Sequence, residues 1–431
     1  MTIFGMIWLA IVIFAFCLKD IRPLIVMTIL GSVFQCNNVI TFAGTGIGPQ
    51  IITSALFVIR VLILRLGRWY PRRAMRTVRI GTIVVLLAVF LSLYANEASV
   101  AAQPLSYKLR IVQLCVYIAC AWAMSSVSSL VDNQFVFKMI LYITVFLLAV
   151  GVLQLAITSG LLPHLTLVNE LFYNDHGEVT YYYRTGYFRI LSTYQEPSYY
   201  ACFIVGAFYF LLCIQKSFRY KKLLISVILI EILLTFSSTA YGALAIGGVL
   251  FVIAAPGIKR KAYLIAIGLV TALLMFSFFT ESLNEVIFNK SSSGSAAARN
   301  GWNAAALRMF ESSPFFGVGY KKSRASSFYL TVLSEQGIIG MTAIVLLITA
   351  VCLPLLMRRS IAKIGIINFA LRIAVLCAFA CMFIAVPDLD IAPLWMWMNC
   401  LLLSSYPSEQ ALRQRDYSPT LTAGARNIGK Y

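Results

Sequence analysis

Charged residues are scarce in this chain. Of its 431 residues only 12% are charged and only 16 are acidic, whereas 60% are hydrophobic. The mean hydropathy is +0.85. A soluble protein of this length needs far more polar surface, and apolar runs near the ~20 residues that cross a ~30 Å hydrocarbon core recur throughout. The composition therefore excludes a soluble globular protein and predicts an all-α polytopic membrane protein.

Histidine and the common catalytic motifs are also scarce or missing. The chain has two histidines, and its ten cysteines fall in or beside apolar runs without the spacing of metal ligands. It contains no P-loop, HExxH, GxSxG or CxxC motif. We therefore expect no metal ion, no cofactor and no disulfide framework.

A net charge of +19 accompanies this apolar composition. Nucleic acid does not explain it, because the basic residues concentrate in short loops between apolar runs, as the positive-inside rule requires of cytoplasmic loops. These loops lie at 65–79, 216–222, 259–261 and 358–363. We predict about 13 (12–14) transmembrane helices, because a count of thirteen puts all four loops on the cytoplasmic side.

The same count places two large loops, at about 160–196 and 280–327, on the external side. Residues 1–406 then form a single transmembrane domain. Residues 407–431, rich in Ser, Arg and Gly, form a cytoplasmic tail with the composition of a disordered segment. A chain that avoids polarity elsewhere carries long polar stretches in these two loops, so we expect the functional site there.

The first external loop ends where the next span begins. Pro197 occupies a typical first-turn helix position, so Glu196 sits just before a helix amino terminus. There a carboxylate can act as a base or orient an acceptor hydroxyl. Arg184, Arg189 and Tyr194 of the same loop are candidate substrate-binding residues. The alternative is an interfacial aromatic belt with ordinary loop residues.

The second external loop carries a stretch, 296–310, that predicts an amphipathic helix. A guanidinium group makes paired, charge-assisted hydrogen bonds to a diphosphate, so Arg299 and Arg308 are candidate catalytic residues. They point to different sides of a helix and would grip different parts of a substrate. Contact with anionic lipid headgroups is the alternative.

A turn follows this helix, and its glycines allow a backbone to approach a ligand closely. The candidate substrate-binding residues of this loop and the next helix are Trp302, Gly317, Gly319, Lys321, Lys322, Arg324 and Tyr329. Asp388 and Asp390 lie in a further short external turn. They can form a carboxylate site, but we interpret them as solvated turn residues.

In their order, these segments resemble the carboxy-terminal signature of the O-antigen polymerase and ligase superfamily of bacterial envelope glycosyltransferases. The matching residues are Arg299, Trp302, Arg308, Pro314-Phe-Phe-Gly317-Val-Gly319, Tyr329-Leu330 and Glu335-x-Gly337-x-x-Gly340. Arg189 and Glu196-Pro197-Ser198 resemble an element of the polymerase branch. Ligases typically carry a His-Asn pair where this chain has Ser326-Ser327, which favours a polymerase.

The resemblance implies a metal-independent glycosyltransferase with a GT-C-like helical fold, at the periplasmic face of the bacterial inner membrane. Its substrate would be an oligosaccharide on undecaprenyl diphosphate. A polymerase transfers the growing glycan to the non-reducing end of a new lipid-linked repeat unit. Membrane lipids are expected partners, a chain-length regulator and a flippase are candidate protein partners, and nucleic acid is not expected. The alternatives are a glycan ligase and, from another class, a polysaccharide flippase or transporter, which should carry charges along a cavity inside its spans.

Overall fold

The computed structural model describes residues 2–42, 45–65, 75–163, 172–173, 183–184, 187–214, 218–254, 294–357 and 364–404. These residues are mostly helical. Their strands form two short antiparallel pairs, β1 (Ile40–Phe42) with β2 (Thr45–Ile47) and β3 (Tyr183–Arg184) with β4 (Tyr187–Phe188). The predicted all-α class is confirmed, and the sequence tail at 407–431 lies outside the described residues.

Seven helices make up the first part of the chain. They are α1 (Ile3–Cys17), α2 (Arg22–Gly31), α3 (Pro49–Arg65), α4 (Arg76–Ala95), α5 (Glu97–Ala101), α6 (Leu105–Val127) and α7 (Asn133–Thr158). Two of them begin at capping side chains, because Thr2 accepts from the backbone N–H of Gly5 at 2.9 Å and Asp132 accepts from that of Phe135 at 2.7 Å.

A second group of helices follows the loop at about 160–196, which the sequence predicts to be external. They are α9 (Pro197–Cys213), α10 (Lys221–Leu234), α11 (Ser238–Ala254), α14 (Gly294–Ser312), α15 (Phe328–Leu356), α17 (Ile366–Ala385) and α18 (Ala392–Leu403). Prolines occupy the first turns of α9 and α18, where a missing N–H costs nothing. Pro197 therefore starts a helix, as the sequence predicts.

Five of these helices, α4, α6, α7, α15 and α17, are long and apolar enough to cross a membrane. Large apolar side chains on outer faces are exposed, among them Phe14, Tyr142 and Leu353, which suits contact with lipid. Both findings support a membrane protein.

The predicted number of spans is not reached within the described residues. Six further apolar helices have only 10–17 residues, fewer than the ~20 that cross a bilayer untilted. The sequence predicts one span over the apolar run at 23–41, but the structure does not form a continuous helix there. The helix α2 ends at Gly31, and a turn with two asparagines leads into β1. Hydropathy registers the length of an apolar run but misses a turn inside it. The predicted span at 262–280 lies outside the described residues.

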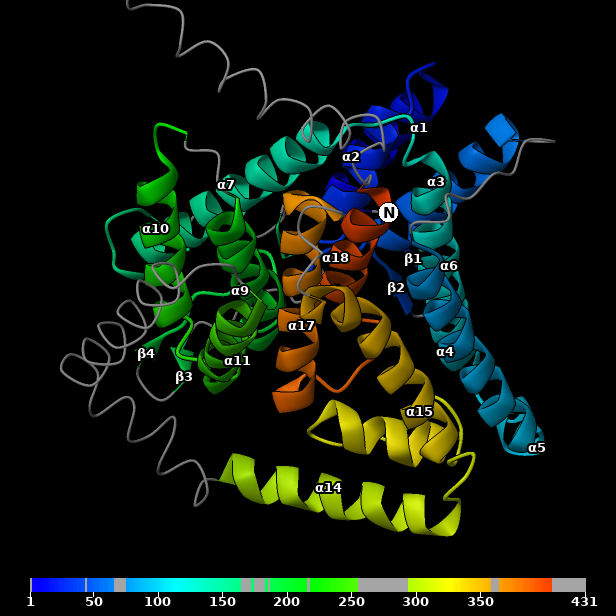
Figure 1. The fold of residues 1–431 in the computed structure, drawn as a ribbon. Helices are drawn as coiled ribbons and strands as arrows, with labels where there is room; N and C mark the ends of the chain where they lie inside the picture. The colour runs from blue at the N-terminus through cyan, green and yellow to red at the C-terminus, as the bar shows by residue number, and fades with distance from the viewer. Residues whose placement is uncertain are drawn as a thin grey trace, which may run out of the picture.

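In Figure 1, α17 and α18 lie between one group of helices (α7, α9, α10 and α11) and another (α1 to α4 and α6). The helix α18 is buried along its whole length, and α17 packs closely against α9. Trp397 fits over Gly206 and donates its indole N–H to the carbonyl of Cys202 at 3.1 Å. These tight contacts anchor the central pair of helices.

A buried arginine stabilises this core. Pro354 lies inside α15 and lacks the N–H that would bind the carbonyl of Ala350. Arg372 of α17, which is only 1% exposed, donates to that carbonyl at 3.0 Å and to Val351 at 2.8 Å. The sequence suggests that Arg372 snorkels or pairs inside the bundle. In the structure it donates hydrogen bonds to two backbone carbonyls of α15, one of which Pro354 leaves without a helical donor.

Candidate functional site

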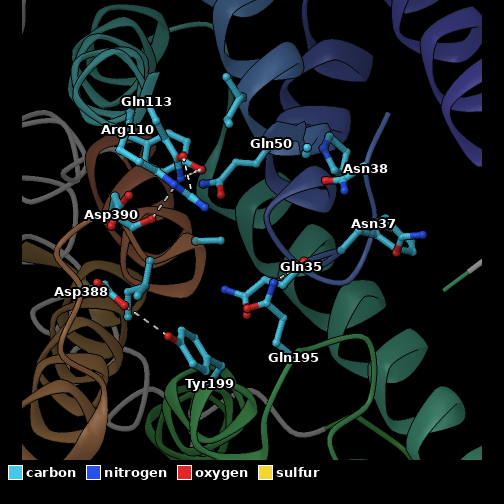
Figure 2. A pocket seen from close by; sticks show the side chains of 18 of the residues that line it. Gln35, Asn37, Asn38, Gln50, Arg110, Gln113, Gln195, Tyr199, Asp388 and Asp390 are labelled. Atoms are coloured by element: carbon cyan, nitrogen blue, oxygen red, sulfur yellow. Dashed lines mark hydrogen bonds between the residues drawn. The ribbon is translucent and has the colours of Figure 1, made fainter. Parts of the chain in front are cut away.

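A polar pocket of about 450 Å³ opens where the beginnings of α3, α6, α9 and α18 meet (Figure 2). The stretch between α2 and α3 and residues 321–324, between α14 and α15, complete its walls. The predicted topology places these segments in external loops or at the external ends of spans. The pocket thus brings polar side chains from several distant segments together in an otherwise apolar bundle.

Three charged side chains from two distant segments form an ion-paired cluster at one wall. Lys321 Nζ lies 2.6 Å from Asp388 Oδ1 and 2.7 Å from Asp390 Oδ1. Burial opposes the positive charge of Lys321, but the two carboxylates outweigh it and raise its pKa above the usual range. Burial likewise opposes the charge of Asp388, but Lys321 outweighs it and lowers the pKa of that carboxyl. Lys321 and Asp388 are therefore held in charged form.

This cluster overturns the interpretation of Asp388 and Asp390 as solvated turn residues. Asp390 is only 6% exposed, and Asp388 also accepts a hydrogen bond from the Tyr199 hydroxyl at 3.4 Å. A charged turn beside two spans is costly unless its charges are paired. This cost could have indicated from the sequence that the aspartates are paired. The sequence does not show the partner, because Lys321 is 67 positions away from Asp388.

The backbone at Lys321 is fixed in an uncommon conformation. Its φ is +62°, which a residue with a side chain adopts only when its surroundings enforce it. The preceding carbonyl, of Tyr320, accepts a hydrogen bond from the Tyr107 hydroxyl at 2.5 Å. Tyr320 itself is fully buried. The position of the Lys321 side chain is therefore set by its own loop and by α6.

Amide side chains line the rest of the pocket (Figure 2). They belong to Gln35, Asn37, Asn38, Gln50, Gln113 and Gln195. Gln113 donates to the Tyr117 hydroxyl at 2.9 Å and to the Asp390 carbonyl at 3.4 Å, and it accepts from Arg110 at 3.3 Å. The sequence analysis missed these residues, although amides inside otherwise apolar runs were a visible signal.

Of the residues that the sequence singles out, the structure places Lys321 and Arg324 in the pocket. The Arg324 guanidinium lies 5.9 Å from the ring centre of Trp302 on α14, within cation–π range. Lys322 instead donates a hydrogen bond to the Ser99 hydroxyl. Glu196 is exposed beside the pocket residue Gln195 and accepts a hydrogen bond from the Ser198 hydroxyl at 3.1 Å.

Arg189 and Tyr194, two further residues predicted in the first loop, do not line the pocket. Arg189 donates to the carbonyl of Thr235 at 3.1 Å, at the end of α10. Tyr194 is fully buried and packs against Tyr200 and Phe203. The backbone of Arg184 belongs to β3, and its side chain lies outside the described residues.

Arg299 and Arg308 lie on α14, which runs below the bundle alongside the first part of α15 (Figure 1). Arg308 is exposed and Arg299 is partly exposed, and neither lines the pocket. Tyr329, at the start of α15, is 42% exposed. The structure therefore separates the two arginines of α14 from the cations of the pocket.

The turn that contains Gly317 and Gly319 and the bend of α15 at Gly337 are joined by backbone hydrogen bonds. Gly337 has a φ of +65° and bends α15 sharply (Figure 1). The bend leaves Ser334 and Glu335 without their helical donors, and the backbone N–H groups of Val318 and Gly319 replace them at 2.9 and 3.0 Å. In return, Pro314 and Phe315 accept from the N–H groups that follow Gly337, at 2.9 and 3.3 Å.

Gly317 is indispensable in this arrangement because a Cβ there would lie 2.2 Å from the backbone carbon of Glu335. The sequence predicts that Gly317 and Gly319 let a backbone approach a ligand, and in the structure the close approach is to α15. The turn at residues 313–319 leads directly into Lys321. The glycines thus determine where the pocket cations lie.

No family model matches the chain, and no curated protein is similar to it. Within the described residues, no three His, Cys, Asp or Glu side chains are grouped to bind a metal ion. The chemistry of the site therefore has to be inferred from the pocket itself: fixed charges at one wall and amides at the other.

Proposed function

We propose that the protein is a membrane-embedded polymerase of lipid-linked oligosaccharide repeat units and that the pocket binds a sugar of its substrate. One observation carries this proposal: amide, hydroxyl and charged side chains converge in a single pocket within an apolar helical bundle. Sugars present many hydroxyl groups, each both a donor and an acceptor, and such groups are matched by amides and carboxylates. A lipid-linked sugar reaches a site of this kind from the membrane.

In the proposed reaction the growing glycan leaves undecaprenyl diphosphate and joins the non-reducing end of a new lipid-linked repeat unit. The diphosphate gains negative charge as its bond to the sugar breaks, and fixed cations nearby stabilise that charge. Arg110 and Arg324 are the pocket cations available for this role, because Lys321 is engaged by two aspartates. We assign to Arg299 and Arg308, on α14, the role of holding the lipid-linked diphosphate as it approaches.

The acceptor hydroxyl needs a group that takes or orients its proton. Asp388 is a weak base because its ion pair with Lys321 lowers its pKa, but it can accept a hydrogen bond. Glu196, at the rim beside Gln195, makes no ion pair among the described residues. We therefore assign the role of base to Glu196 and the role of orienting the acceptor to Asp388.

The proposal includes the finer topology predicted from the sequence. About thirteen spans would put the pocket at the periplasmic face of a bacterial inner membrane, with the cationic loops in the cytoplasm. The chain would belong to the O-antigen polymerase and ligase superfamily. No geometric observation favours the ligase, since Ser326, at one of the two positions where ligases carry His-Asn, donates to the side chain of Asn303 at 2.9 Å.

A flippase or transporter is the alternative from another class. Such a protein needs charges along a path through its spans. Among the described residues, the charged side chains buried inside helices are Arg79, Glu231, Glu335 and Arg372, and none of them lines the pocket. Arg372 satisfies backbone carbonyls of α15, and Glu231 accepts a hydrogen bond from the Tyr200 hydroxyl at 2.6 Å. The polar pocket collects its charges at helix beginnings and in connecting segments.

Reconstitution tests the proposal directly. Purified protein in liposomes receives one synthetic repeat unit on undecaprenyl diphosphate, and mass spectrometry follows the lipid-linked products. Polymerase activity gives lipid-linked chains of two or more units with release of undecaprenyl diphosphate. Movement of unextended repeat units across the bilayer, without any longer product, would establish a flippase and refute the proposal.

A further inference from the structure

We infer that the amide-lined part of the pocket selects a sugar ring with two adjacent free hydroxyl groups and that Gln50 is the specificity-determining residue. This assignment rests on the proposed function, because it takes the pocket to be a sugar site. It adds the chemical feature that the site recognises and the side chain that recognises it.

Gln50 combines burial with unmet hydrogen-bonding capacity. It is 4% exposed, and neither its Oε1 nor its Nε2 has a hydrogen-bond partner among the described residues. It lines the pocket and points into it (Figure 2). A buried amide without partners is unfavourable in a folded protein and is retained where a ligand supplies those partners.

The backbone around Gln50 is tightly held. Gln50 follows Pro49 in the first turn of α3, and its carbonyl accepts a hydrogen bond from the Thr53 hydroxyl at 3.2 Å. The end of α2 packs against this turn, because a Cβ on Gly31 would lie 3.3 Å from the Gln50 backbone. The side chain is therefore presented from a rigid platform, as selective recognition requires.

The geometry of a primary amide matches that of a vicinal diol. The amide holds one acceptor and a pair of donors side by side in a plane. Two adjacent ring hydroxyls present a donor and an acceptor at a similar separation, so both bonds can form together. A trans acetamido group directs its N–H and C=O to opposite sides, so it cannot pair with one amide in this way.

Neighbouring amides support the same function. The side-chain oxygen of Gln35, Oε1, is also buried without a partner among the described residues. Gln195 donates to the backbone carbonyl of Gln35 at 3.2 Å. Gln113 is instead satisfied by Arg110 and Tyr117. Gln50 is thus the amide in this pocket with both of its functional atoms available, and Gln35 adds a second acceptor.

The test uses methyl glucoside, galactoside and mannoside, each with its 3-deoxy analogue. Loss of the 3-hydroxyl removes every adjacent pair of free ring hydroxyls from these glycosides while leaving the ring intact. Binding to purified protein in nanodiscs is followed by saturation-transfer NMR, which detects weak ligands and requires no transfer reaction. We expect at least one parent glycoside to bind and its 3-deoxy analogue to bind about tenfold more weakly.

Two variants assign that discrimination to Gln50. Gln50→Leu should bind each pair equally weakly, and Gln50→Glu, which keeps the shape and two acceptors but loses the donors, should bind the parent with intermediate affinity. Gln103→Leu is the matched control, because Gln103 lies outside the pocket and donates to the Ser99 carbonyl at 3.3 Å. It should bind as the unaltered protein does.

Three results would overturn the inference: no parent glycoside binds, the parent and 3-deoxy forms bind equally, or Gln50→Leu keeps the preference. These results are separable from a failure of the proposed function. Chain extension without discrimination at Gln50 refutes only this inference. Discrimination at Gln50 by a protein that never extends a repeat unit refutes only the polymerase.

Discussion

Two cationic regions of this protein differ in how their charges are held. On α14, Arg308 is exposed and Arg299 is partly exposed. In the pocket, Lys321 is ion-paired with two aspartates. Arg110 and Arg324 are exposed but contact Gln113 and Trp302, respectively. Charges fixed before the substrate arrives need little reorganisation and therefore contribute most to binding and catalysis. The abundance of arginine is thus a weaker guide to a site than the number of contacts that hold each charge.

The two regions are nevertheless connected. Asn303 of α14 accepts hydrogen bonds from the backbone and hydroxyl of Ser326, both at 2.9 Å. Trp302 lies under Arg324, and Ala306 of α14 is fully buried. The helix α14 therefore supports the loop that carries the pocket cations. We therefore expect Arg299 and Arg308 to contribute less to chain extension than the contacts by which α14 holds this loop.

The largest effect is expected from breaking the ion-paired cluster. Lys321→Met leaves two carboxylates facing each other in a buried site, which should cost about 3–5 kcal/mol of stability and abolish chain extension. Thermal unfolding in detergent and the reconstituted extension assay measure the two effects. Lys322→Met, one residue away and outside the pocket, should change neither. Normal stability and extension in Lys321→Met would show that the cluster is dispensable.

Glu196 should have the next largest effect, and on rate alone. Glu196→Gln keeps the size of the side chain but removes proton acceptance, so extension should slow by ~10²- to 10⁴-fold. Its exposure means that stability should not change. Single-turnover extension and thermal unfolding measure both. If Glu196→Gln extends repeat units at the normal rate, the carboxylate is not the base.

Gly317 tests how the pocket cations are positioned. Gly317→Ala drives a methyl group into the backbone of α15 and strains a left-handed residue, which should cost about 1–3 kcal/mol of stability. Extension should fall as well, because Lys321 and Arg324 would shift. Gly301→Ala is the control, since a Cβ at this helical position meets no atom within 4 Å. Equal stability of the two variants would argue against the interlocked turn.

The α14 arginines should show a smaller effect, which sharpens the contrast with the pocket. Arg308→Ala and Arg299→Ala each remove a contact to an approaching diphosphate at an exposed position, where such contacts are worth ~1 kcal/mol or less. We expect a loss of extension of at most about fivefold, seen mainly in KM for the lipid-linked unit. A complete loss of extension with normal protein abundance would instead place the reaction at α14.

The smallest effect is expected from pH. The pKa of Asp388 is lowered, so its contribution to stability is present above its unfolded value of roughly 4 and is lost only as pH falls below that. The pKa of Lys321 is raised, so its contribution is present below roughly 10 and is lost only above that. The contribution of this ion pair to stability should therefore vary little between about pH 5 and 9. Thermal unfolding of the unaltered protein and of Lys321→Met across this range measures that contribution, and a difference between them that collapses near neutrality would contradict the charged cluster.

The sequence predicts the helical membrane class because apolar composition and periodicity depend on neighbouring residues. It also predicts that Pro197 starts a helix, and α9 begins there. Two cations of the pocket, Lys321 and Arg324, were among the predicted residues. Each of these inferences uses local information.

What the sequence does not reveal depends on contacts between distant segments. The aspartates look like a solvated turn until Lys321 is placed beside them, and the pocket amides come from four separate stretches of chain. In the sequence, Gln50 is a single polar residue at the start of a predicted helix, and nothing nearby marks it as part of a site. Only the packing of α2, α3, α6 and α9 shows that its side chain faces the same space as the others.

Photo-crosslinking tests most directly the claim that substrate sugar binds in the pocket and not on α14. A lipid-linked repeat unit with a photoreactive group on its non-reducing sugar is irradiated with the reconstituted protein, and the labelled peptides are sequenced. We predict labels in 35–50, 110–117 or 388–392, reduced in Gln50→Leu. Labels confined to 294–312, unchanged by that substitution, would contradict this account.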